Sequence, residues 1–113
     1  MAKLPKETVT IIFDLQRQLL DRIDEATGTE AIVFEQFGEN QARLELEQLQ
    51  NARERARSSY SRLYTLLLRV AEAQPVANSA ILDLLAQSIE QAAAINSASQ
   101  ASIQEIKRDW NLL

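Results

Sequence analysis

The segment Ala42–Val70, ARLELEQLQNARERARSSYSRLYTLLLRV, decides the fold because its apolar residues recur at alternating intervals of four and three. This spacing places them along one side of a helix and predicts a helix over about 39–73. One charged residue, Arg53, interrupts the seam. The seam consists of Ala42, Leu46, Leu49, Arg53, Ala56, Tyr60, Leu63, Leu67 and Val70.

A second seam with the same alternation predicts a helix over about 77–111, and its polar members are Asn96 and Ser99. If the chain reverses beside Pro75, residues that face each other across the two helices have numbers that add to 152. Arg53 then faces Ser99, so polar residues meet polar residues. The second seam consists of Leu82, Leu85, Ile89, Ala92, Asn96, Ser99, Ile103, Ile106, Trp110 and Leu113.

A shorter seam predicts a first helix over about 5–27, with Pro5 at its start and Gly28 just past its end. Gln16 is its polar member. If this helix runs antiparallel to the second, facing residues have numbers that add to about 69, which places Gln16 beside Arg53. The seam consists of Val9, Ile12, Gln16, Leu19, Ile23 and Ala26.

The segment 30–37 is ambiguous because Ala31–Phe34 has strand propensity while Val33 and Phe37 have helical spacing. We favour a short helix, since the chain offers no second strand to pair with it. The expected fold is therefore all-α: a single domain over 1–113 in which a long helical hairpin and a shorter first helix form a three-helix antiparallel bundle with a short helical connector.

The polar seam residues form a predicted core polar layer. A buried arginine without a partner is costly, so we expect Gln16 and Asn96 to offer Arg53 their side-chain carbonyls, or its stem to reach outward. The layer either fixes register and orientation, which we favour, or forms a small-molecule or ion pocket. Its members are Gln16, Arg53, Asn96 and Ser99.

The chain carries more apolar surface than a monomeric three-helix bundle needs. We expect the surplus on the first and second helices to form a homodimer with two-fold symmetry. On the third helix, Leu84–Gln104 holds one charge among many Ala and Ser residues, which suits either a helix with neighbours on two sides or an alanine-rich surface helix. The predicted oligomer face consists of Ile11, Phe13, Leu15, Tyr64 and Leu68.

Arg55, Arg62 and Arg69 are spaced by seven and form an outward stripe on the second helix. Arginine forks match phosphate oxygens, so the stripe could contact nucleic acid. We favour a structural role, in which these cations complement the helix dipole and pair with neighbouring carboxylates, because an aromatic stacking platform is missing here. An acidic end, predicted as a solvated surface rather than a cation site, comprises Asp21, Asp24, Glu25, Glu45 and Glu47.

The 113 residues include no Cys and no His, and the net charge is −4. Thiolate and imidazole chemistry are therefore excluded, and no Gly-rich phosphate loop, metal-ligand cluster or nucleophile elbow occurs. We expect no catalytic site, cofactor or metal, and a cytoplasmic protein without a membrane span.

The function that fits best is a non-enzymatic protein–protein interaction module, a small scaffold or regulatory adaptor with a protein partner. Nucleic-acid binding through Arg55, Arg62 and Arg69 is the alternative. A carrier that uses the polar layer as its pocket is a third reading.

Overall fold

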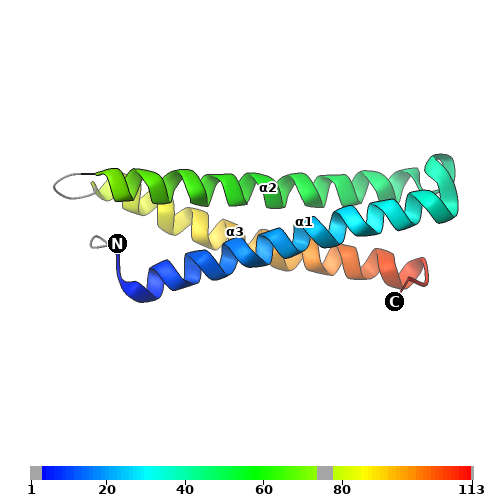
Figure 1. Ribbon diagram of the computed structural model, residues 1–113, viewed down its shortest axis with the longest axis horizontal. Coiled ribbons are helices and arrows are strands. Elements are labelled where there is room, and N and C mark those ends of the chain that lie inside the picture. Colours follow the sequence, from blue (N-terminus) through cyan, green and yellow to red (C-terminus); the bar gives the residue numbers. More distant parts are fainter. Residues whose placement is uncertain (1–3, 74–77, 113) are drawn as a thin grey trace.

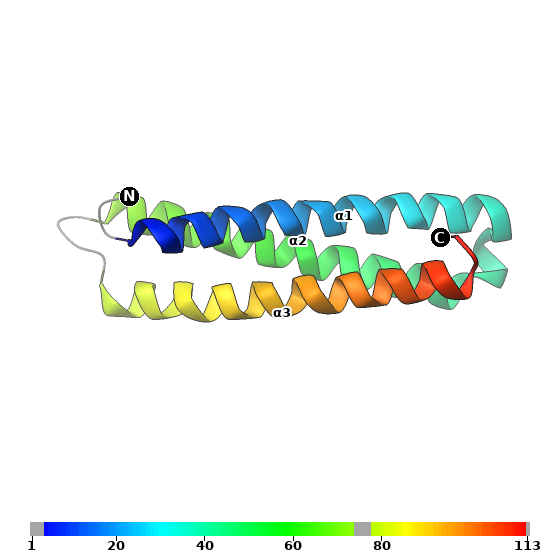
Figure 2. The ribbon, with the colours of Figure 1, turned by 90° about the horizontal axis from the view of Figure 1, so that it is seen from below.

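The computed structural model describes residues 4–73 and 78–112, and within these ranges it contains three helices and no strand. The helices are α1 (Lys6–Gln41), α2 (Arg43–Glu72) and α3 (Ser79–Asp109). They lie side by side along a long axis of 56 Å, and each packs against both others (Figures 1 and 2). The predicted all-α helical bundle is thus confirmed. The turn predicted at Pro75 and Val76 lies outside the described residues.

Helix α1 continues through Gly28, so the break predicted there is wrong. The Thr29 hydroxyl donates to the backbone carbonyl of Glu25 at 2.7 Å, one turn back within the same helix. The buried residues of α1 also keep their spacing of three and four across the glycine: Leu15, Leu19, Arg22, Ala26, Thr29 and Val33. The ranges 5–27 and 30–37 are therefore parts of one helix that packing carries past Gly28.

The first chain reversal depends on Gly38, whose backbone angles are φ 78° and ψ 166°. This conformation is essentially restricted to glycine, because a side chain would clash with the backbone. The Ala42 N–H then donates to the Gly38 carbonyl at 3.2 Å, and α2 begins at Arg43. The chain thus bends at Gly38 and not at Gly28, and residues 39–41 at the end of α1 already lie beyond the bend.

The later bend shifts the register between α1 and α2. Arg53 Nε donates to Glu30 Oε1 at 3.4 Å, and these residue numbers add to 83 rather than about 69. The difference of two heptads arises because α1 is longer than predicted. Between α2 and α3, Arg62 Nη1 donates to Gln91 Oε1 at 3.4 Å, and these numbers add to 153, within one of the predicted value.

The core consists of two apolar clusters, one toward each end of the bundle. The larger joins the first half of α1 to the second half of α2 and the first half of α3. The smaller joins the opposite halves, and Phe37 and Trp110 close its end with ring centroids 4.3 Å apart. The larger cluster contains Ile12, Leu15, Leu19, Ala56, Leu63, Leu66, Leu67, Val70, Leu85 and Ala92, and the smaller contains Ala26, Val33, Ala42, Leu49, Ile103 and Ile106.

The two glycines offer a matched test of these backbone assignments. Gly38→Ala should lower the free energy of unfolding by about 1–3 kcal/mol, because alanine is strained at a positive φ. Gly28→Ala should raise it by about 1 kcal/mol, since a Cβ there meets no heavy atom within 4 Å and alanine favours helix. Urea denaturation measures both, and effects of the same sign would contradict the continuous α1.

Candidate protein-interaction surfaces

A polar layer that contains Arg22, Glu25, Asn96 and Ser99 lies between the two apolar clusters. Asn96 and Ser99 are buried there, as the sequence predicts, and Asn96 Nδ2 donates to Gln18 Oε1 at 2.8 Å. The Arg22 side chain, 10% exposed, donates from Nη2 to Glu25 Oε1 at 2.9 Å. The layer therefore holds a largely buried ion pair that joins two turns of α1.

The expected meeting of Gln16 with Arg53 does not occur. The Arg53 side chain is 32% exposed and pairs with Glu30 instead of the amides of Gln16 and Asn96, in keeping with the alternative that its stem reaches outward. Gln16 is buried, but it lies on α1 before Leu19, alongside the larger cluster. The register shift explains both results, because it moves Gln16 two heptads away from the position opposite Arg53.

Sequence reasoning missed Arg22 because the adjacent apolar residue Ile23 was taken as the seam position between Leu19 and Ala26. The signal was present, since Leu15, Leu19, Arg22 and Ala26 keep the three–four alternation. Hydrogen bonding in the layer is incomplete: Arg22 Nε, Glu25 Oε2 and Asn96 Oδ1 are buried with no hydrogen-bond partner among the described residues. A half-satisfied polar layer stabilises little, and it favours the one register in which its members meet.

Removing one partner of the Arg22–Glu25 pair should destabilise the bundle. Glu25→Ala leaves the buried guanidinium without its carboxylate, and we expect a loss of about 1–3 kcal/mol in the free energy of unfolding. Arg22→Leu combined with Glu25→Gln should recover most of this loss. The control is Glu47→Ala in the exposed Arg43–Glu47 pair, which should cost less than about 0.5 kcal/mol in the same urea titration. Equal losses for Glu25→Ala and Glu47→Ala would refute the assignment.

The exposed apolar residues on one side of the contact between α1 and α2 form a surface that we call the apolar face. Phe13, Leu20 and Phe34 are spaced by multiples of seven, so they share one line along α1. Phe34 lies one turn beyond Glu30 on α1, and Tyr64 lies three turns beyond Arg53 on α2. The exposed apolar residues of both helices therefore lie on the side of the bundle where Glu30 and Arg53 pair. The face consists of Phe13, Leu20, Phe34, Tyr64 and Leu68, all 44–56% exposed.

Two residues of the predicted oligomer face lie elsewhere. Leu15 belongs to the larger core cluster and is 7% exposed, so its assignment to an exposed face is wrong. Ile11 is exposed, but it lies one heptad before Gln18, whose amide oxygen accepts from Asn96 of α3. Ile11 therefore borders α3 and not α2. Phe13, Tyr64 and Leu68 remain together, and Leu20 and Phe34 join them.

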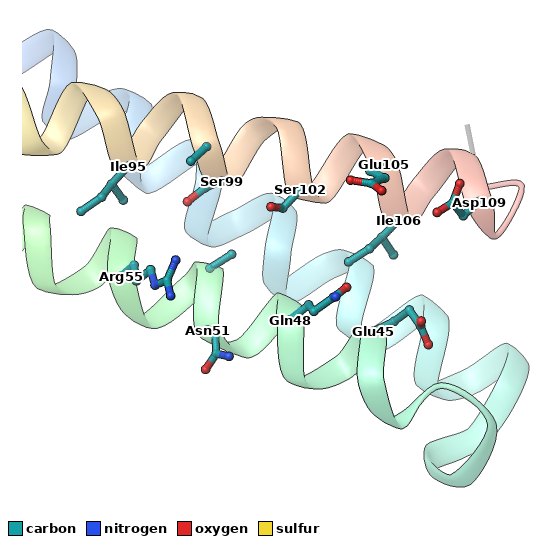
Figure 3. Close-up of a pocket in the computed structure, with 12 residues that line it drawn as sticks. Glu45, Gln48, Asn51, Arg55, Ile95, Ser99, Ser102, Glu105, Ile106 and Asp109 are labelled. Atoms are coloured by element: carbon teal, nitrogen blue, oxygen red, sulfur yellow. The ribbon is translucent and has the colours of Figure 1, made fainter.

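The opposite side of α2 forms a shallow groove with α3, which we call the α2–α3 groove. Its most enclosed part, about 370 Å³, has Glu45, Glu105 and Asp109 toward one end and Arg55 toward the other (Figure 3). Further hollows continue the groove to Arg62 and then to Arg69 and Leu84. Serine and other small side chains line much of its length: Ser58, Ser59, Ser61, Ser88, Ala98, Ser99 and Ser102.

The arginine stripe lies in this groove, and its charges are unpaired. None of Arg55, Arg62 and Arg69 forms an ion pair with a carboxylate in residues 4–73 or 78–112. Their expected pairing with neighbouring carboxylates is therefore wrong for the described residues. Glu105 and Asp109, at the other end, likewise form no ion pair with any described residue. The groove thus has an acidic end and a mainly basic end, where Glu54 lines the same hollow as Arg55 and Arg62.

The predicted acidic end does not assemble. Glu25 pairs with Arg22 in the polar layer, and Glu47 pairs with Arg43 on the surface of α2. Across the described part of the chain, no group of three or more carboxylates is placed to hold a metal ion. The described helices also include none that is long and apolar enough to cross a membrane. Comparison of the chain with protein-family models, with curated proteins and with solved structures found no match.

Proposed function

We propose that this protein is a non-enzymatic interaction module, a small scaffold or regulatory adaptor, that acts as a homodimer of three-helix bundles with consecutive helices antiparallel. The observation that carries the proposal is the apolar face. Five large apolar side chains are about half exposed on one side of α1 and α2, although the molecule already buries two apolar clusters. Large apolar patches on small proteins are characteristic of binding surfaces.

The position of the apolar face supports its use for another protein. Phe13, Leu20, Tyr64 and Leu68 all neighbour core residues of the larger cluster, so a firmly packed part of the bundle supports them. Three of the face's five residues are aromatic, a type enriched at the centres of protein interfaces. A rigid apolar surface loses little conformational entropy when a partner covers it, which favours binding.

The apolar face should react with a partner at defined positions. A photo-crosslinking amino acid at Phe13 or Tyr64 should produce one discrete adduct with another protein in extract of the native source. The same group at Glu90, exposed and charged on α3, should not. Leu20→Glu should abolish the Tyr64 adduct, because a carboxylate in an apolar interface is costly to desolvate. Equal labelling from Tyr64 and Glu90 would contradict a dedicated apolar face.

The dimer is tested separately, by sedimentation equilibrium. We expect a species of twice 12.7 kDa at about 100 μM protein, a concentration at which even weak specific dimers form. A monomer throughout would refute the homodimer and leave the apolar face as a surface for a different protein.

Nucleic-acid binding is a second candidate function, favoured by the unpaired arginines of the groove. Glu45, Glu105 and Asp109 in the same groove oppose it, because they would repel a polyanion laid along the full length. We therefore expect no binding of a labelled single-stranded oligonucleotide at 150 mM salt with a dissociation constant below about 100 μM. Tighter binding that Arg62→Glu abolishes would establish this alternative.

A further inference from the structure

We propose that two copies of the chain pair through their apolar faces about a two-fold axis parallel to the helices, so that α1 of each copy packs on α2 of the other. This inference rests on the homodimer of the proposed function and names its surface. Because one face then serves both contacts, a paired copy cannot hold a different protein. Pairing at high concentration masks the surface that a partner finds on a dilute copy.

The two sides of the apolar face lie level with each other along the bundle. The ion pair between α1 and α2 sets the register, so residues of these antiparallel helices whose numbers add to about 83 lie at the same height. Leu20 is therefore level with Tyr64, and Phe13 lies near the level of Leu68. These four side chains gather within about 11 Å of helix length, and Phe34 lies about 21 Å beyond Leu20.

A two-fold axis parallel to the helices keeps these levels and exchanges the two sides of the face. The α1 side of one copy then meets the α2 side of the second copy at the same height. Leu20 contacts Tyr64 of the second copy, Phe13 contacts Leu68 of the second copy, and each contact forms twice. The two α1 helices and the two α2 helices thereby enclose the apolar side chains between antiparallel neighbours, as in a four-helix bundle.

The charges on the face fit the same axis independently. Arg57 shares the α2 line of Tyr64, one heptad earlier, and Asp24 lies one turn beyond Leu20 on α1, within two positions of the level of Arg57. Both charged residues are exposed, and neither forms an ion pair with a described residue. The rotation that brings Leu20 to Tyr64 also brings Asp24 to Arg57 of the second copy, so two salt bridges form across the pair.

The other charged groups on this side do not oppose the pairing. Arg53 and Glu30 neutralise each other within one copy, at 3.4 Å. Arg17 lies nine positions from the level of Arg57, so about 14 Å of helix length separates these two cations across the pair. Glu54 lies on the other side of α2, where it lines a hollow of the α2–α3 groove. The apolar face therefore brings no like charges together.

A two-fold axis across the helices fits less of the face. It lays α1 on α1 and α2 on α2 in opposite directions, with Phe13 against Leu20. Phe34 would then lie beyond the start of α1 in the second copy and stay uncovered. Asp24 would lie far from Arg57, because α1 no longer faces α2. The parallel axis thus accounts for residues that the crosswise axis leaves without a contact.

The covered surface has the size of a specific but dissociable interface. From Phe13 to Phe34 the face runs for about 32 Å, and two helices each about 10 Å wide give an area of about 600 Å² on each copy. Standard interfaces cover about 600–1,000 Å² on each partner. The lower end of this range suits a dimer that separates on dilution and so exposes the apolar face.

Cysteine crosslinking distinguishes the two axes, since the chain has no cysteine of its own. Thr27 shares the α1 line of Leu20 and Phe34, and it lies within one position of the level of Arg57. The parallel axis therefore brings Thr27 to Arg57 of the second copy. Thr27→Cys protein mixed with Arg57→Cys protein should form a disulfide-linked heterodimer under mild oxidation. Placing the two cysteines on separate chains prevents a link within one copy.

The matched control replaces Arg57→Cys with Lys6→Cys, which also removes one exposed cation. The crosswise axis would bring Thr27 to Lys6 of the second copy, because their numbers add to 33, as do those of Phe13 and Leu20. The Thr27/Arg57 mixture should give at least a tenfold higher yield of linked heterodimer than the Thr27/Lys6 mixture. All three substituted side chains are exposed, so these variants should keep the wild-type fold, which circular dichroism checks.

Charge reversal provides the second measurement. Asp24→Arg and Arg57→Glu should each raise the dimer dissociation constant about tenfold, because each creates two symmetric repulsive contacts. Mixing the two variants should restore a heterodimer of near wild-type affinity, since both contacts then join opposite charges. The control Asp21→Arg makes the same charge change one turn earlier, beside Gln18 on the α3 side of α1, and should leave the dissociation constant unchanged.

The outcomes separate the two proposals. A dimer by sedimentation whose Thr27/Arg57 linkage does not exceed the Thr27/Lys6 control overturns this interface and retains the homodimer. Failure of the charge-reversed mixture to restore the dimer likewise overturns it. A monomer at every concentration overturns both the homodimer and its surface.

Discussion

The backbone bend at Gly38 determines which residues meet in this bundle. With φ at 78°, this position stops α1 and returns the chain as α2, so it sets the register between them. That register brings Glu30 to Arg53 and aligns the core positions of α1 with those of α2. A bend one or two heptads earlier would keep the same side of α1 toward the core but bring other α1 residues opposite each level of α2. Arg22 would then lie against other neighbours, and the polar layer could not form as it does.

Much of this architecture was accessible from the sequence, and the limits have physical causes. The predicted pairing of α2 with α3 is within one residue of the observed one, because both helices keep the alternation of four and three along their length. The sequence underestimates the length of α1, because a glycine such as Gly28 is typical of a helix end. Glycine costs a helix only about 1 kcal/mol. Burial of Val33 and Phe37 beyond it outweighs that cost, since each large apolar side chain contributes about 1.5–3 kcal/mol.

The candidate surfaces were only partly predictable, for a related reason. Apolar residues point almost all the way round the first half of α1, so their spacing does not reveal which of them face inward. Leu15 and Phe13 are equally apolar, yet one is core and the other half exposed. The spacing of seven reveals the arginine stripe in the sequence. The groove beside the stripe and the distances between its arginines and carboxylates depend on how α3 packs against α2, which the spacing does not give. The two surfaces differ in chemistry, so salt should act on the α2–α3 groove far more than on the apolar face.

The polar layer also has a consequence for how the bundle moves. It separates an apolar cluster of ten buried residues from one of six, and the buried polar atoms between them are incompletely hydrogen-bonded. Such a layer should couple its two sides weakly, because the apolar clusters lie on either side of it. We expect the end closed by Phe37 and Trp110, which has the smaller cluster, to open to hydrogen exchange more readily than the half that carries Phe13 and Tyr64, so that the apolar face sits on the slower-exchanging half.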